Sequence, residues 1–124
     1  MGWINIFFFD TYAIIEIIKG NPNYERFKKE KIITSFLNII ELHYSVLKNS
    51  GKEDATLISA EYARYIVPIS LEAIEEANLF RLGNIKKKIS TADAVGYILS
   101  KKFSVKFLTG DKEFEKLDNV EFVR

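Results

Sequence analysis

The sequence has no cysteine, and its 124 residues include only two prolines and one histidine. Without cysteine, the chain can form neither disulfides nor thiolate metal sites, which is compatible with the cytoplasmic location that we expect. Charge of one sign is also missing, because 18 Lys and Arg against 17 Asp and Glu leave a formal net charge of +1. No global field therefore favours or opposes nucleic acid, and any such binding must be local. No apolar run approaches the length of a membrane span, so we expect no membrane contact.

The composition that remains is that of a folded protein. Hydrophobic residues make up 48% of the chain and charged residues 28%, the balance of a globular domain. The length predicts a single domain over residues 1–124. Strand and helix patterns alternate along the chain, which predicts an α/β fold: a three-layer α/β/α sandwich around a central, mostly parallel sheet.

Hydrophobic periodicity sets the expected elements. Strands are predicted over residues 3–9, 31–34, 66–69, 105–108 and 120–123. Helices are predicted over residues 11–19, 24–30, 35–48, 52–65 and 71–84. A further helix is predicted to begin after Ser90 or Thr91, and a single helical turn is predicted over residues 112–117. The side chains expected to face inward from the two central helices are Phe36, Ile39, Ile40, His43, Val46, Leu47, Leu57, Ile58, Tyr62 and Tyr65.

Four acidic residues stand at the ends or flanks of these elements. Asp10 follows the first strand, and Asp111 follows the fourth after Thr109 and a glycine. Asp93 lies in the opening turn of a helix, and Glu41 lies in the middle of one. Each has an ordinary structural explanation: a helix cap for Asp10 and Asp111, a favourable helix dipole for Asp93, and a solvated face for Glu41.

Taken together, the four acids indicate a site. The carboxyl ends of parallel strands meet at one edge of a sheet, which is where open α/β sheets bind ligands. Carboxylates brought together there repel one another and raise one another's pKa values unless a cation lies between them. All-oxygen ligands suit Mg²⁺ or Mn²⁺. Such a cation can activate water and stabilise the charge that develops in phosphodiester cleavage.

The chain resembles the PIN domain family, and within it the small VapC-like ribonuclease toxins. The match runs along essentially the whole chain, and its motifs occur in the family's order: Phe9-Asp10-Thr11, Ile39-Ile40-Glu41-Leu42, Thr91-Ala92-Asp93-Ala94 and Leu108-Thr109-Gly110-Asp111-Lys112-Glu113-Phe114. The resemblance implies a PIN-like fold and a metal-dependent endoribonuclease that hydrolyses RNA phosphodiester bonds. It also implies the toxin of a type II toxin–antitoxin pair, often a homodimer and usually neutralised by a small antitoxin.

The resemblance assigns the site residue by residue. It implies that Asp10, Glu41 and Asp93 bind Mg²⁺ or Mn²⁺, with Asp111 as a fourth and more variable acid and Thr109 as the hydroxyl residue beside them. Thr11 matches the Ser or Thr that commonly follows the first acid. Tyr12-Ala13 departs from the family, because Tyr12 is bulkier than the small residue usual there.

Two other functions are compatible with parts of the sequence. A PIN-like fold could keep its acids and act as a protein-binding module without nuclease activity. A phosphoryl-transfer enzyme of the haloacid-dehalogenase or receiver type also begins with an Asp after its first strand, but the dehalogenase type needs a second Asp where this chain has Tyr12.

Basic residues and the lone histidine have two possible roles each. Lys86, Lys87 and Lys88 could contact RNA phosphates or form a solvated helix end, and the same holds for Lys101, Lys102, Lys106 and Lys112. His43 lies roughly 200° around the helix from Glu41, so we interpret it as a core or boundary residue and not as a base.

Overall fold

The structure is a computed structural model that describes residues 5–124; Trp3 and Ile4, which the sequence assigned to the first strand, lie outside this range. Its centre is a four-stranded sheet with the order β2-β1-β3-β4, in which every pair of neighbours is parallel. The strands are β1 (Ile6–Phe9), β2 (Lys31–Ile33), β3 (Lys106–Thr109) and β4 (Val120–Phe122).

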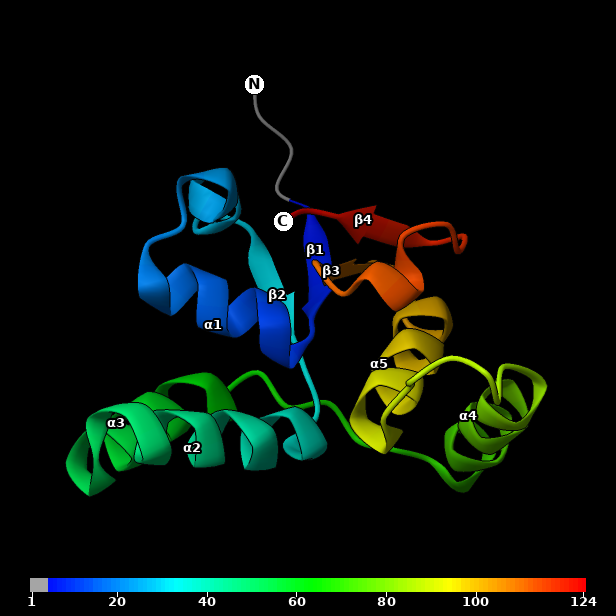
Figure 1. Cartoon of the computed structure of the whole chain (residues 1–124), viewed down its shortest axis with the longest axis horizontal. Coiled ribbons are helices and arrows are strands. Elements are labelled where there is room, and N and C mark those ends of the chain that lie inside the picture. Colours follow the sequence, from blue (N-terminus) through cyan, green and yellow to red (C-terminus); the bar gives the residue numbers. More distant parts are fainter. Residues whose placement is uncertain (1–4) are drawn as a thin grey trace.

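Helices cover both faces of this sheet, which confirms the predicted three-layer sandwich (Figure 1). They are α1 (Thr11–Lys19), α2 (Phe36–Ser50), α3 (Lys52–Ala63), α4 (Leu71–Gly83) and α5 (Thr91–Lys102), with short 3-10 turns η1 (Pro22–Phe27) and η2 (Lys112–Phe114). Helices α1, α2 and α3 lie on one side of the sheet, and α4 and α5 lie on the other. Within residues 5–124, none of the helices combines the length and the apolar character that crossing a membrane requires.

The apolar run of β1 explains why the sheet lies in the centre. Phe7 and Phe9 belong to the core on the side of α1 and α2, together with Leu42. Phe8 points to the opposite core, where its ring packs 5.8 Å from that of Phe107. A strand that is covered on both faces needs apolar side chains at successive positions, so it shows no alternation with polar ones.

The predicted strand over residues 66–69 is wrong. Ile66 forms only an isolated parallel bridge with Thr34, and the ladder does not continue beyond it. Pro68, two residues later, has no N–H to donate to a ladder, which limits pairing at this point. The predicted helix over residues 24–30 is instead the 3-10 turn η1.

The predicted buried face of α2 is confirmed in part: Val46 is buried and Ile39 packs against the core, but Phe36, Ile40 and Leu47 are exposed. The most exposed large apolar side chains of this helix, which we call the α2 stripe, are Phe36, Ile40, Tyr44 and Leu47, with exposed fractions of 51%, 59%, 64% and 40%. The buried residues are Asn38, Leu42 and Val46. Leu57 of α3, expected to face inward, is 66% exposed, and Ala55 is buried there instead.

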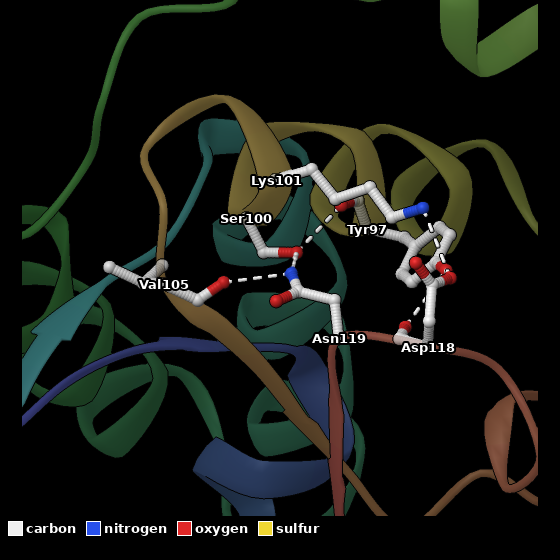
Figure 2. Close-up of polar contacts among 6 residues, drawn as sticks. All are labelled: Tyr97, Ser100, Lys101, Val105, Asp118 and Asn119. Carbon is white, nitrogen blue, oxygen red and sulfur yellow. Dashed lines mark hydrogen bonds and ion pairs between the residues drawn. The ribbon is translucent and has the colours of Figure 1, made fainter.

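A network of polar contacts joins α5 to the turn that precedes β4 (Figure 2). The Tyr97 hydroxyl lies 2.5 Å from a carboxylate oxygen of Asp118, and Lys101 forms an ion pair of 3.1 Å with the same oxygen. Asn119, in the left-handed region with φ of 61°, donates from Nδ2 to the backbone oxygen of Val105 at 2.9 Å. The network therefore fixes the helix that carries Asp93 against the far end of the segment that begins with Asp111.

Candidate active site

The four acids lie at the carboxyl edge of the sheet, at the point where successive strands are added to opposite sides of β1. From β1 the chain passes to β2 on one side, and it returns through the helices to β3 on the other side of β1. Asp10 follows β1 directly, and its backbone N–H donates to the oxygen of Leu108 in β3 at 3.3 Å. Side chains that follow β1 and β3 are therefore neighbours, as expected at such a switch point.

Asp10 is both the N-cap of α1 and a buried acid. Its Oδ1 accepts a hydrogen bond of 2.8 Å from the N–H of Ala13, and the residue is only 1% exposed. Burial raises the pKa of Asp10 to about 8, against the lowering effect of hydrogen bonds from Thr109 and Ala13. The negative charges of Asp93 and Asp111 raise its pKa further, because nearby like charges oppose ionisation.

Asp93 belongs to a capping box at the start of α5. Its N–H donates to Ser90 Oγ at 3.0 Å, and its Oδ2 accepts from the N–H of Ser90 at 3.3 Å. Burial raises the pKa of Asp93 to about 6, against the lowering effect of hydrogen bonds to its carboxyl from the side chain and the backbone N–H of Ser90, and the charges of Asp111 and Glu41 add to the rise. Asp93 therefore lies in the first turn of α5, where the sequence predicted a favourable helix dipole, and its side chain both caps the helix and is coupled to two other acids.

Thr109 and Asp111 form the β3 side of the site. The hydroxyl oxygen of Thr109, which is fully buried, accepts a hydrogen bond of 3.0 Å from the N–H of Asp111. Asp111 in turn accepts from the N–H of Glu113 at 3.0 Å and caps the turn η2. Thr109 also lowers the pKa of Asp10 by hydrogen bonding, so this hydroxyl connects the first acid to the last.

Glu41 reaches the site from α2. One of its oxygens, Oε1, accepts a hydrogen bond of 2.6 Å from the hydroxyl of Thr11, which follows Asp10 at the start of α1. The sequence identified Thr11 by resemblance, but it did not indicate this contact or the fully buried Asn38 behind it. The only signal for Asn38 was its spacing, three residues before Glu41 on one helix face.

The four carboxylates influence one another electrostatically, which places them around one locus. Asp10 is affected by Asp93 and Asp111, and Asp93 is affected by Asp111 and Glu41. The donor set is entirely oxygen, so its chemistry fits Mg²⁺ or Mn²⁺. Over residues 5–124, however, no group of three such side chains is arranged closely enough to hold a metal ion directly. Asp10, Asp93 and Asp111 each accept a backbone N–H through one oxygen, and a carboxylate that accepts one N–H still has lone pairs for a cation.

Basic side chains lie beside the α5 end of the site. Lys87 donates to the backbone oxygen of Glu113 at 3.2 Å, and Arg81 donates to the hydroxyl of Thr91 at 3.1 Å. Lys86 and Lys88 are exposed on the turn before α5, and His43 is half-buried on α2. Lys101 and Lys102, by contrast, form ion pairs with acids elsewhere.

Comparison with known proteins identifies a family and a set of similar structures. Residues 7–120 match the family model of the PIN domain. No curated protein sequence matches the chain. Among solved structures, a toxin–antitoxin complex from Klebsiella pneumoniae has a chain with a TM-score of 0.71 and 17% identity, over 92% of this chain and 94% of that one.

Two further structures are similar over nearly their whole length. VapC20 from Mycobacterium tuberculosis, described as a toxin that cleaves the sarcin–ricin loop, has a TM-score of 0.76 and 18% identity over 95% of this chain and 99% of its own. VapBC2 from Rickettsia felis, bound to a DNA fragment from its promoter, has a TM-score of 0.73 and 19% identity over 96% and 99%. At such identities the likeness shows a shared fold.

Proposed function

The chain belongs to the PIN domain family, and from this membership and its acidic site we propose that it is an Mg²⁺- or Mn²⁺-dependent endoribonuclease that hydrolyses RNA phosphodiester bonds. The observation that carries the proposal is the convergence of Asp10, Asp93, Asp111 and Glu41 at the carboxyl edge of the sheet. VapC20, which has the same fold, is described as a toxin that cleaves the sarcin–ricin loop.

The proposal gives each residue a role. Asp10, Glu41 and Asp93 would hold the cation, and Asp111 would assist, directly or through water. A bound divalent cation would supply an acidified water and stabilise the charge that develops on the phosphodiester. Thr109 orients the segment of Asp111 by accepting its N–H.

The RNA backbone would contact basic side chains close to the acids. Lys86 and Lys88 are exposed on the turn before α5, and Lys112 is exposed just after Asp111. Lys87 connects this turn to η2 by a hydrogen bond from its side chain to the backbone oxygen of Glu113. Because the net charge of the chain is only +1, this local group must supply the attraction for phosphates.

Titration with Mn²⁺ separates a nuclease from a binding module that has merely kept its acids. We expect Mn²⁺ to raise the melting temperature of the wild-type protein, because a ligand that binds only the native state stabilises it by about 2.7 kcal/mol at 100 times its Kd. The measurement is differential scanning fluorimetry at fixed ionic strength. Glu61→Gln is a matched control, since Glu61 of α3 is exposed and pairs with Arg64 at the end of that helix; its response to Mn²⁺ should equal that of the wild type. The absence of a response in both proteins would favour the binding module.

We also propose that the protein is the toxin of a type II pair, with a small antitoxin as partner, and that it forms a homodimer. Among the structures with this fold, one is a toxin–antitoxin complex and VapC20 is described as a toxin. The chain presents two apolar surfaces that could take protein partners. One is the α2 stripe. The other, the α4 face, consists of exposed residues on the outer side of that helix: Leu71, Ile74, Leu79 and Leu82.

The homodimer is testable on the α4 face. We expect Leu82→Glu to convert a dimer into a monomer, because it places a charge on an apolar interface. Leu82 is 68% exposed in the single chain, so the folded protomer should tolerate the change. Light scattering coupled to size exclusion measures the mass. Leu57→Glu on α3, where Leu57 is 66% exposed, is the matched control and should leave the dimer intact. A dimeric Leu82→Glu protein would place the interface elsewhere.

A further inference from the structure

Asn38 lies on α2, one turn before Glu41, and its side chain is fully buried. It forms the middle of a hydrogen-bond chain. Ser35 Oγ donates to Asn38 Oδ1 at 2.7 Å, and Asn38 Nδ2 donates to Thr11 Oγ1 at 3.2 Å. Thr11 Oγ1 then donates to Glu41 Oε1 at 2.6 Å. The chain therefore runs from the cap of α2, across to α1, and back to the acid.

The direction of this chain follows from its last member. An ionised carboxylate can only accept hydrogen bonds, so Thr11 directs its single hydrogen to Glu41 Oε1. The oxygen of Thr11 then accepts from Asn38 Nδ2, and Asn38 Oδ1 accepts from the hydroxyl of Ser35. Ser35 Oγ also caps α2 by accepting the backbone N–H of Asn38 at 3.4 Å.

We propose that Asn38 is a positioning residue for Glu41, which it holds through the hydroxyl of Thr11. The inference rests on the proposed function, in which Glu41 binds the cation. With Asn38 in place, the Thr11 hydroxyl can act only as a donor toward the carboxylate, and Glu41 Oε1 is held in one place. Fixing an acid before it binds a metal lowers the entropy that binding costs, and partners of this kind typically change metal affinity about 10- to 100-fold.

A purely structural role for Asn38 makes a different prediction. A buried amide that only supports the start of α2 would lower the melting temperature when replaced, and the affinity of the site for metal would not change. Two measurements distinguish these roles. The first is the affinity of the site for metal in the absence of RNA, and the second is the effect of replacing Asn38 in proteins with and without the Thr11 hydroxyl.

The experiment measures the Kd for Mn²⁺ alone, from the free Mn²⁺ signal in electron paramagnetic resonance, on the full chain at constant pH. We expect Asn38→Leu and Thr11→Val each to weaken Mn²⁺ binding about tenfold. We expect the double variant to bind no more weakly than Thr11→Val, because Asn38 acts through that hydroxyl. Thr11→Ser keeps the hydroxyl and should retain the wild-type affinity.

Ser100→Ala is the matched control. Ser100 is also fully buried and hydrogen-bonded, since its hydroxyl donates to the backbone oxygen of Tyr97 at 2.6 Å, but its contacts lie in the network of Figure 2 at the other end of α5. Its replacement should lower the melting temperature and leave the Kd for Mn²⁺ unchanged.

If Asn38→Leu does not fold, Asn38→Ser, which is smaller and polar, replaces it in the same comparison.

Each outcome decides between the proposals. A wild-type protein that binds no Mn²⁺ overturns the metal-dependent function and this inference together. A wild-type protein that binds Mn²⁺, with an Asn38 variant that binds it equally well, overturns the inference alone. Additive losses in the double variant would show that Asn38 does not act through Thr11, which also overturns it.

Discussion

Asp10→Asn should abolish RNA cleavage, with a loss of about 10³-fold or more in rate, equivalent to roughly 4 kcal/mol of transition-state stabilisation. The substitution removes the negative charge that lies deepest in the acidic site and leaves the shape of the side chain unchanged. The assay follows cleavage of a labelled RNA with Mg²⁺ or Mn²⁺ present. An Asp10→Asn protein that cuts RNA as fast as the wild type would refute the proposed nuclease.

The same substitution should make the metal-free protein more stable. Asp10 caps α1 by accepting the N–H of Ala13, and Asn is as good a cap as Asp, so the helix loses little. The cost of burying this carboxyl, either as an anion or with a proton taken up on folding, disappears at the same time. Loss of activity therefore comes with a gain in stability, which a variant that merely misfolds cannot show.

The pH dependence of that gain follows from the pKa of Asp10. Burial raises this pKa from its ordinary value of 3.8 to about 8 in the folded protein, so the native state holds a proton that the unfolded chain has released. The contribution of Asp10 to stability is fully present below pH 4 and is lost as the pH rises toward 8. At pH 7 the loss reaches at most about 4 kcal/mol. We expect the wild type to lose this stability between pH 4 and 8, and Asp10→Asn to avoid most of the loss.

Urea unfolding at several pH values, with a chelator present, measures this difference. Glu61→Gln serves as the control, because Glu61 is exposed on α3 and its removal should leave the pH profile of the wild type in place. If Asp10→Asn is less stable than the wild type at pH 8, the carboxylate at this position is stabilised as an anion, and the electrostatic account of the site is wrong.

Most of the strands and helices, and the positions of Asp10 and Asp111 directly after β1 and β3, could be predicted from the sequence because they depend on local patterns. An apolar run such as β1 can be satisfied only in a doubly covered sheet, and acids that follow parallel strands must meet at one edge. The buried face of α2 could be predicted only in part in this way. Its apolar residues suggested one face, but Asn38 is buried by long-range hydrogen bonds to Thr11, and the α2 stripe is turned outward.

Substitution of Gly110 should be among the most damaging changes to the fold. Gly110 lies between Thr109 and Asp111, and a Cβ placed on it would stand 2.2 Å from a ring carbon of Tyr12 and 2.5 Å from the backbone oxygen of Val123. Gly96 of α5 is similarly confined, but by rings alone: a Cβ there would lie 2.7 Å from Phe8. Contacts this short cannot exist, so the surroundings must move.

We expect Gly110→Ala and Gly96→Ala each to lower the free energy of unfolding by about 3 kcal/mol, the upper part of the range for overpacked cores. Chemical denaturation measures both. Gly83→Ala is the matched control, because nothing lies within 4 Å of a Cβ at the end of α4. It should stabilise the protein by up to about 1 kcal/mol, since alanine is the better helix former.

A second substitution can show whether a side chain or the backbone causes the loss of stability in each glycine variant. Phe8→Leu should restore much of the stability lost in Gly96→Ala, because the shortest obstacle is a side chain that leucine shortens. Tyr12→Ala should restore little in Gly110→Ala, because the oxygen of Val123 belongs to the backbone beyond β4 and remains in place. In Gly110→Ala the segment that carries Thr109 and Asp111 must then move, so this variant should also bind Mn²⁺ more weakly. The double variant Gly96→Ala with Phe8→Leu should bind Mn²⁺ like the wild type. Full rescue of Gly110→Ala by Tyr12→Ala would show that the tyrosine ring, and not the backbone, sets the position of the β3 side of the site.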